Sequence, residues 1–147
     1  MADQVVNKFP VPTITEIDKD YWEGVQKGIL RLQKCLDCNR LQFFPRPVCI
    51  YCYSSNLGWQ EAKGTGTVYS FTNIFVPQEP AFRERVKATG LPIIFALIDM
   101  DEGVRITSEI VGCRPEEVEL GARVKVTFEL VTGTDFKLPK FRLEKSS

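Results

Sequence analysis

Apolar and polar residues alternate in short runs along most of the chain, a pattern that predicts a protein built mainly from β-strands. A first strand is expected over 29–34, leading into the first pair of cysteines. From Trp59 onward the signal is β, and we expect a long strand over 67–76 and a nearly continuous apolar strand over 91–100. After a tight turn, a further strand is expected over 104–111, and the last clear strand spans 123–131. Strands joined by tight turns fit a small closed or half-closed barrel, and the count suits a five-stranded OB-like barrel.

One helix is predicted near the N-terminus, beginning at Thr13 or Thr15. Each threonine has an acidic residue three positions later, Glu16 or Asp18, and this spacing is a helix start signal. Gly28 is a plausible residue to end the helix. A helix of about three turns is not stable alone, so its apolar face must pack on the rest of this chain or on another subunit. That face contains Ile17, Tyr21, Trp22 and Val25.

Three segments lack a regular pattern. Residues 1–13 are polar and rich in proline, which favours an extended path, either as a loose terminus or as an arm along a partner. Residues 39–48 contain two prolines and are expected to form a loop or ribbon. Residues 77–90 are expected to form a charged loop, which is long for a compact barrel.

Four of the five cysteines form two CxxC pairs, Cys35 with Cys38 and Cys49 with Cys52, with ten residues between the pairs. Each pair places two sulfurs on one turn, and two pairs complete a tetrahedral set for one metal ion. A closed set of four sulfurs leaves no position for substrate, so we predict a structural site. Zinc is the expected ion, iron suits the same sulfurs, and reduced pairs without metal are the alternative. Cys113 is expected to be a buried thiol without a chemical role.

The composition argues against several classes of function. The chain has 147 residues, of which 19 are basic and 19 acidic, and zero net charge argues against a dedicated binder of nucleic acid or anionic membrane. It has no histidine, so it lacks a Ser-His-Asp triad, a Cys-His dyad and any His-ligated metal. No apolar run is long enough for a membrane span and no signal peptide is evident, so we expect a cytoplasmic protein with reduced cysteines.

Charge is unevenly distributed along the chain. Residues 27–63 carry six basic and two acidic side chains, a net charge of +4. These bases either offset the negative charge of four thiolates around a divalent ion or bind the phosphates of a ligand such as coenzyme A. Candidate coenzyme A contacts are Arg46 on the ribbon and Arg83, Arg85 and Lys87 on the long loop. The alternative is that the charged side chains of this loop are only solvated and bind no ligand.

An ordered series of short segments carries a family resemblance. They are Tyr21-Trp22-Glu23-Gly24, Leu32–Cys38, Phe44–Cys52, Gly64–Thr72, Glu102–Ile106, Gly121–Val126 and Leu138–Phe141. This series resembles the acyl-CoA-associated zinc-ribbon and OB-fold family, long labelled domain of unknown function 35. The resemblance covers about residues 14–143, and the order of the segments is specific although each segment alone is weak.

The resemblance implies N-terminal helices, a rubredoxin-like zinc ribbon and a C-terminal OB fold. Members of this family work as small companions of thiolase-fold enzymes, for example of benzoylsuccinyl-CoA thiolase, and the larger subunit carries the catalytic cysteine and histidines. This chain is therefore expected to have no catalytic residues, to bind structural zinc through its four ribbon cysteines and to help hold acyl-CoA. We expect a hetero-oligomer with two copies of each subunit.

The partner contact is expected to centre on the ribbon and the helix, because protein interfaces favour aromatic and arginine side chains. The ribbon also carries Tyr51, Tyr53 and Trp59, more aromatic surface than it can bury alone. The candidate anchors are Tyr21, Trp22, Phe43, Phe44 and Arg46.

The expected fold is mainly β, with three parts in chain order. They are an N-terminal arm and helix over 1–30, a zinc ribbon over 31–60 and an OB-fold domain over 61–147. Two other functions stay open: a nucleic-acid-binding ribbon and OB module, and a stand-alone acyl-CoA binder or hydrolase. Without histidine, a hydrolase would need a carboxylate base such as Asp99, Asp101 or Glu102.

Overall fold

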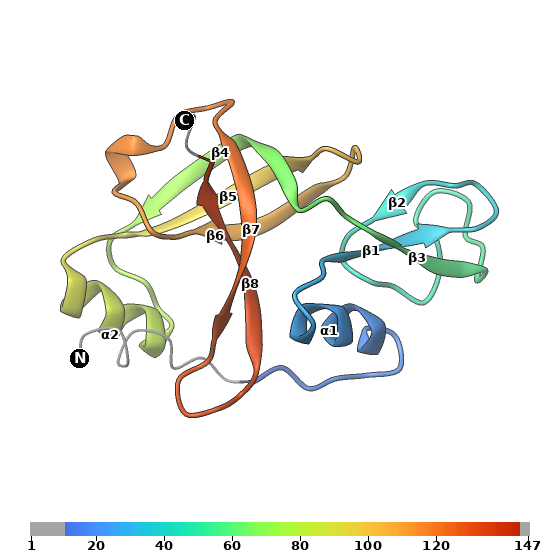
Figure 1. The fold of residues 1–147 in the computed structure, drawn as a ribbon, viewed down its shortest axis with the longest axis horizontal. Helices are drawn as coiled ribbons and strands as arrows, with labels where there is room; N and C mark the ends of the chain where they lie inside the picture. The colour runs from blue at the N-terminus through green and yellow to red at the C-terminus, as the bar shows by residue number, and fades with distance from the viewer. Residues whose placement is uncertain (1–10, 145–147) are drawn as a thin grey trace.

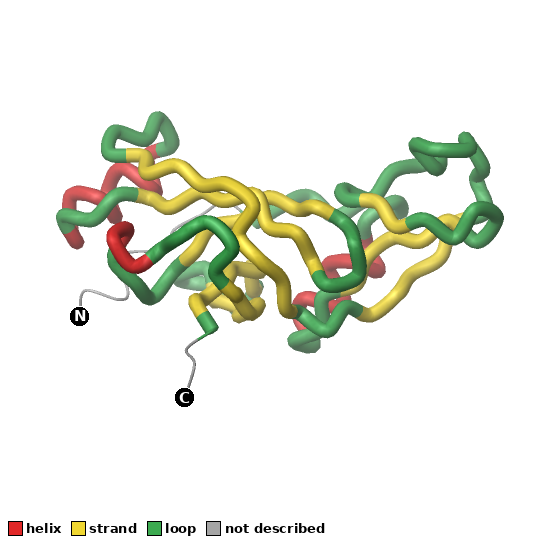
Figure 2. The backbone as a smooth tube through the Cα atoms, turned by 90° about the horizontal axis from the view of Figure 1, so that it is seen from above, coloured by secondary structure: helices red, strands yellow, loops and turns green. Residues whose placement is uncertain are grey.

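The computed structural model describes residues 11–144, which form two lobes at opposite ends of an elongated molecule (Figures 1 and 2). One lobe is a closed five-stranded barrel, and the other is a three-stranded sheet that carries both cysteine pairs. Most of the expected N-terminal arm lies outside the described residues. No helix within 11–144 has both the length and the apolar character needed to cross a membrane.

The elements follow one another from the small sheet to the barrel. In chain order they are α1 (Lys19–Gln26), β1 (Arg31–Cys35), β2 (Leu41–Gln42), β3 (Leu57–Glu61), β4 (Thr65–Ile74), α2 (Pro80–Thr89), β5 (Ile93–Met100), β6 (Arg105–Ile110), the short 3-10 helix η2 (Pro115–Glu117), β7 (Arg123–Leu130) and β8 (Lys137–Leu143).

Helix α1 is shorter than the sequence predicts, because it begins at Lys19 rather than at a threonine. Thr15 does meet Asp18: its backbone N–H and its hydroxyl donate to Asp18 Oδ1 at 2.7 and 3.0 Å. These bonds close a turn that precedes the helix, so the start signal marks the turn instead. The predicted end near Gly28 is confirmed, since this glycine has a φ of 77° and so adopts the left-handed conformation that commonly ends helices.

The aromatic face of α1 packs within this chain, between the two lobes. Tyr21 is only 5% exposed, and its ring centroid lies 6.0 Å from that of Phe43 on the ribbon side. The ring of Trp22 lies 5.4 Å from that of Phe136 on the barrel side. Of the two packing partners open from the sequence, the rest of this chain is therefore the one that α1 uses.

The ribbon sheet, with strand order β2-β1-β3, is held by buried glutamines as well as by apolar side chains. Gln33 on β1 and Gln42 on β2 are 4% and 2% exposed, and Gln42 Nε2 donates to Gln33 Oε1 at 2.6 Å. Gln33 Oε1 also accepts from the Arg46 N–H at 2.8 Å, and Gln42 Oε1 accepts from the Ile50 N–H at 2.9 Å. Two side chains thus fix the loop that leads into the second cysteine pair.

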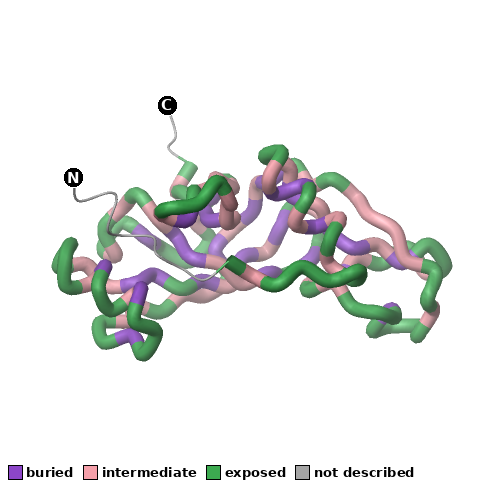
Figure 3. The backbone as a smooth tube through the Cα atoms, turned by 90° about the horizontal axis from the view of Figure 1, so that it is seen from below, coloured by how far each residue is buried: buried purple, intermediate pink, exposed green. Residues whose placement is uncertain are grey.

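The barrel strands run in the order β4-β5-β6-β8-β7, and β7 pairs back to β4 to close the barrel. All pairs are antiparallel except β6 with β8, which run parallel and meet at Ile110 and Phe141. Figure 3 shows that buried positions concentrate along the barrel strands, whereas the ribbon end is mostly exposed or half-buried. The largest fully buried barrel side chains are Val68, Ile98, Val124, Val131 and Phe141.

Strand β8 completes the barrel and is absent from the strands that the sequence pattern predicts. Its charged residues and Pro139 weaken the strand signal, and its partners lie far along the chain. Phe141 is fully buried and faces Val126 of β7. The predicted number of barrel strands is confirmed, but the β signal that begins at Trp59 belongs to β3 of the ribbon sheet.

The prediction of a charged loop over 77–90 is wrong, because most of this segment forms helix α2. The Glu79 side chain accepts from the Ala81 N–H at 3.4 Å, and Pro80 occupies the first turn. Gly90, with a φ of 69°, ends the helix. The charged residues suggested a loop, but most of them lie on the exposed face of a short helix.

Candidate metal centre

The two cysteine pairs sit on two turns of the same backbone shape. In the first turn, the Asn39 N–H donates to the carbonyl of Cys35 at 2.9 Å, and in the second the Tyr53 N–H donates to the carbonyl of Cys49 at 3.0 Å. Asn39 and Tyr53 both adopt positive φ, at 64° and 62°. The chain therefore builds the same sulfur-bearing turn twice, once after β1 and once before β3.

The four sulfurs of these turns converge on one point. All four Sγ atoms lie within 4.8 Å of one another, with 3.5 Å between Cys35 and Cys52 and 3.6 Å between Cys38 and Cys49. A tetrahedron of zinc–sulfur bonds of about 2.3 Å requires sulfurs about 3.8 Å apart. None of the four forms a disulfide. The thiols are thus arranged as a single donor set that fits a structural zinc ion.

Backbone N–H groups favour the thiolate form of Cys35 and Cys49. For Cys38 and Cys52 the neighbouring cysteine thiols and burial outweigh the backbone N–H groups and raise the pKa, to about 12 for Cys52. Burial acts to raise the pKa of Cys49, but the backbone N–H groups of Cys52 and Tyr51 outweigh it, and the pKa falls to about 7. The backbone N–H of Cys38, at 3.4 Å from the Cys35 sulfur, lowers the pKa of Cys35. Two of the ligands are thereby prepared to lose their protons as a metal ion binds.

A carboxylate ties the first cysteine turn to the segment that follows the second. Asp37 accepts hydrogen bonds from the Ser54 hydroxyl and, at 3.1 Å, from Asn56 Nδ2. These bonds lower the pKa of Asp37, so the carboxylate stays charged at neutral pH. On the same lobe, the Arg40 guanidinium lies 4.6 Å from the centroid of the Tyr51 ring.

The structure separates the candidate coenzyme A contacts. Arg46 is exposed on the ribbon loop, whereas the other three lie on α2 of the barrel lobe. Arg83 is exposed and donates to the carbonyls of Pro77 and Gln78, and Lys87 is also exposed. Arg85 is 8% exposed and bonds to the carboxylate of Glu109. Three basic side chains of α2 therefore share one helix without sharing one surface.

The aromatic residues of the ribbon divide into a buried and an exposed group. Phe43 and Trp59 are half-buried and pack against the main core. Phe44, Tyr51 and Tyr53 are 56%, 48% and 79% exposed. Together with three other exposed apolar side chains of this lobe, they form a set that we call the ribbon face. Its members are Leu36, Phe44, Val48, Ile50, Tyr51 and Tyr53.

Of the three carboxylates that a hydrolase could use, two are paired with arginines. The third, Glu102, accepts from the Lys63 N–H at 2.7 Å through Oε2, and its buried Oε1 has no hydrogen-bond partner within residues 11–144. Asp99 pairs with Arg105 at 2.6 Å, and Asp101 accepts two bonds from Arg123 at 2.7 and 2.8 Å. The hydrogen bonds from Arg123 and Thr65 hold the pKa of Asp101 well below its usual range. Such a carboxylate is a poor proton acceptor at neutral pH.

Known sequence families and structures match both lobes. The family “ChsH2, rubredoxin-like zinc ribbon domain” matches residues 22–58, and the family “ChsH2, C-terminal OB-fold domain” matches residues 59–129. The solved structure “Ltp2-ChsH2(DUF35) aldolase” shares 31% sequence identity and a TM-score of 0.76, covering 90% of this chain and 98% of that chain. This chain belongs to the DUF35 family. The predicted order of zinc ribbon and OB fold is thereby confirmed.

Other DUF35 relatives are named for acyl-CoA enzymes. “Benzoylsuccinyl-CoA thiolase subunit BbsA” of Geobacter metallireducens is 30% identical over 115 residues, covering 74% of this chain and 69% of that protein. “Probable enoyl-CoA hydratase alpha subunit” of Thermomonospora curvata is 32% identical over 133 residues, covering 90% of this chain. This chain spans 39% of the length of that hydratase subunit.

Proposed function

We propose that this chain is a non-catalytic, zinc-binding companion subunit of a thiolase-fold enzyme that forms or cleaves carbon–carbon bonds in acyl-CoA substrates. BbsA is named as a thiolase subunit, and a DUF35 protein accompanies Ltp2 in an aldolase structure, which supports this class of partner. The residues of this chain support the division of labour. It has no histidine, and two of its three candidate carboxylates, Asp99 and Asp101, are paired with arginines.

The ribbon face is the observation that carries the proposal. The ribbon lobe has six large apolar side chains that are between 40% and 79% exposed, and it is too small to cover them. Exposed apolar surface of this kind marks interaction sites. The net charge of +4 over residues 27–63 falls to about +2 when four thiolates bind a divalent ion, and this remainder suits an acidic partner surface. Tyr21 leaves the set of candidate anchors because it is buried, and Trp22 and Phe43 are half-buried against the main core. Phe44 and Arg46 are exposed and stay within the set.

Zinc at the ribbon would act on structure rather than on chemistry. Cys35, Cys38, Cys49 and Cys52 would hold the ion in a closed shell, which leaves no position for water or substrate. The ion would lock the two cysteine turns together and so present the ribbon face in one shape. The ribbon would then serve as a rigid docking element.

Contact with acyl-CoA is a finer part of the proposal. Arg83 and Lys87 are exposed cations on α2, and Arg46 is an exposed cation on the ribbon, so each is available to a phosphate of bound acyl-CoA. Arg85 is engaged by Glu109 and would need to exchange that bond. We place the complex in the cytoplasm, where thiols stay reduced and available to metal.

The test begins with the partner itself. The native partner is co-purified with this chain and identified by mass spectrometry, and the two proteins are then studied apart and mixed by light scattering and activity assay. We expect a hetero-oligomer with two copies of each subunit, and a partner that gains stability or activity in the mixture. A partner that is fully active and equally stable alone would refute the companion role.

A second candidate function is that of a subunit of a hydratase. The relative from Thermomonospora curvata and the “3-oxo-4,17-pregnadiene-20-carboxyl-CoA hydratase alpha subunit” of Mycobacterium tuberculosis, 31% identical over 108 residues, are both named as hydratase subunits. This chain spans 39% and 32% of their lengths, so it matches one part of each. Identification of a hydratase instead of a thiolase-fold protein in the co-purified complex would favour this candidate.

A further inference from the structure

A groove follows the seam between the ribbon lobe and the hairpin that joins β5 to β6, which reaches toward the ribbon in Figure 1. Two cavities of about 530 and 480 Å³ form this seam groove, and both are lined by Tyr51 and Gly103. Concave surfaces with apolar walls and a few polar groups are typical of binding sites. The apolar walls come from both lobes and consist of Leu41, Phe43, Ile50 and Val104.

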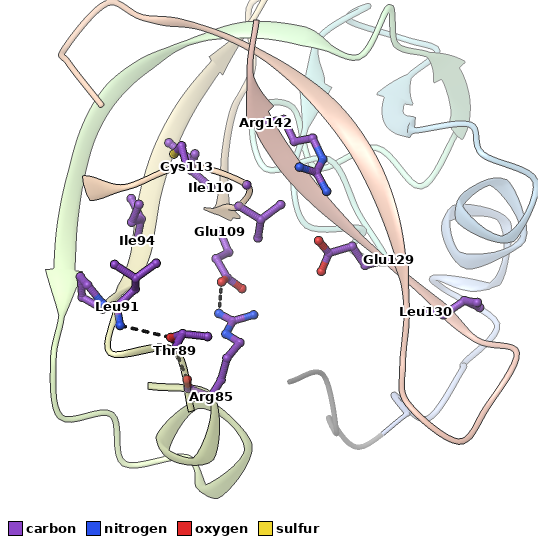
Figure 4. Close-up of a pocket in the computed structure, with 13 residues that line it drawn as sticks. Arg85, Thr89, Leu91, Ile94, Glu109, Ile110, Cys113, Glu129, Leu130 and Arg142 are labelled. Atoms are coloured by element: carbon purple, nitrogen blue, oxygen red, sulfur yellow. Dashed lines mark hydrogen bonds and ion pairs between the residues drawn. The ribbon is translucent and has the colours of Figure 1, made fainter. Parts of the chain in front are cut away.

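A larger cavity on the barrel lobe, of about 610 Å³, shows how the seam groove differs (Figure 4). The charged lining of that cavity, two arginines and two carboxylates, is balanced, and Arg85 there donates to Glu109. None of the described side chains that line it has a buried polar atom without a hydrogen-bond partner. The seam groove, in contrast, has such an atom in Glu102.

Glu102 brings an unpaired acceptor to the seam groove. It lies in the turn between β5 and β6 and lines the smaller of the two cavities. Its Oε2 accepts from the Lys63 N–H at 2.7 Å, which fixes the carboxylate to the segment that joins the ribbon sheet to the barrel. Its Oε1 is buried and has no partner among the described residues. Because a buried charged acceptor without a partner is costly, this oxygen favours a donor that enters the groove.

The charges that line the seam groove balance in each of its cavities. In the smaller cavity Arg40 stands against Glu102, but its guanidinium lies 4.6 Å from the centroid of the Tyr51 ring and forms no hydrogen bond or ion pair within residues 11–144. In the larger cavity Asp99 and Arg105 are paired with each other at 2.6 Å. A balanced lining favours an uncharged occupant that offers both hydrogen-bond donors and acceptors.

We propose that the seam groove holds an extended, uncharged segment of the catalytic partner, which donates a hydrogen bond to Glu102. An extended backbone supplies N–H donors and carbonyl acceptors along its length, and its uncharged side chains can cover the apolar walls. Two residues of the ribbon face, Ile50 and Tyr51, also line the groove, so a partner bound to that face lies beside it. The proposal rests on the companion role and names the part of the partner that the barrel lobe would contact.

The experiment measures the affinity of the full zinc-loaded chain for the co-purified partner by calorimetric titration. In Glu102→Gln, the amide oxygen can keep the bond from the Lys63 N–H, so an NH2 group that cannot accept takes the place of Oε1. Affinity should fall about tenfold or more, because a hydrogen bond to a charged group contributes a factor of about that size. Glu119→Gln removes the same charge at an exposed position of the barrel lobe and should bind as the parent chain does.

Hydrogen exchange of the unmodified complex gives a second measurement that does not depend on a variant. Backbone amides of residues 39–43 and 102–105, on the two sides of the seam groove, should gain protection when the partner binds. The proposal is overturned if the two glutamate variants bind alike or if these amides gain no protection. If Phe44→Ala still weakens the complex in that case, the companion role stands without the groove. A chain that forms no complex at all would refute the companion role itself, and this proposal with it.

Discussion

In the ribbon, two buried amide side chains take the place of a larger apolar core. Gln33 and Gln42 bond to each other and to backbone groups of the loop that follows β2. The sequence pattern contains no sign of this role, because a glutamine in a short strand is usually a solvated side chain and its partners here are backbone atoms. The convergence of the four cysteine sulfurs, in contrast, could be predicted, since the spacing of the pairs determines which sulfurs share a turn.

Replacement of Gln33 tests this arrangement. Gln33→Leu should lower the free energy of unfolding by about 2 kcal/mol, because the buried Gln42 side chain and the Arg46 N–H each lose an acceptor. The measurement is chemical denaturation of the zinc-loaded protein. Gln78→Leu, at an exposed position, is the control and should change stability little. Equal stability of the two variants would contradict the role given to Gln33.

The metal assignment is tested at single cysteines. Cys35→Ser should lose zinc and solubility, because three thiolates no longer close the tetrahedral shell, whereas Cys113→Ser should keep both. Elemental analysis should give about one zinc ion per chain for a four-thiolate site. Zinc that persists in a variant lacking both Cys35 and Cys49 would show that the metal binds elsewhere.

Among the elements, α2 and β8 show where local patterns fail. Both ends of α2 carry readable signals, Pro80 and Gly90, but the helix is short and is held to the barrel by Arg85, whose partner Glu109 is 24 positions away. Strand β8 has an irregular pattern and gains its stability from pairing with β7 and β6. The central barrel strands were predictable because their alternation reflects burial on one face, which is a local property.

The two sheets should respond differently to metal removal. A strong chelator should melt the ribbon while the barrel stays folded, because the three-stranded sheet has little core of its own and the barrel buries its own set of apolar side chains. Hydrogen exchange should show lost protection for amides of β1 and β3 and retained protection in β5 and β6. Simultaneous loss of protection in both sheets would mean that the lobes unfold as one unit.

The molecule as a whole consists of a ribbon lobe and a barrel lobe, with α1 packed between them. Tyr21 and Trp22 connect α1 to both lobes, so a partner bound to the ribbon face would be held at a defined orientation to the barrel. The sequence indicated an interface from an excess of aromatic residues. It could not show which aromatics were exposed, because that depends on how the ribbon, helix and barrel pack together.

Docking through the ribbon face can be tested with two phenylalanines of similar exposure. Phe44→Ala should weaken the complex with the co-purified partner roughly thirtyfold, because a well-buried aromatic anchor contributes about 2 kcal/mol. Phe75→Ala, at a residue 64% exposed on the barrel lobe, should leave affinity and zinc content unchanged, and Phe44→Ala should also keep its zinc. A stronger effect at Phe75 than at Phe44 would show that the partner binds the barrel lobe instead.

The position of β8 between β6 and β7 has a consequence for how the chain folds during synthesis. Strand β8 lies between β6 and β7 in space but follows both in the chain, so the barrel stays open along one side until residue 143 has left the ribosome. The ribbon sheet is complete at Glu61 and can take up its metal ion long before. A nascent chain therefore passes through a stage with a finished ribbon and two unpaired barrel edges, when it is most exposed to aggregation.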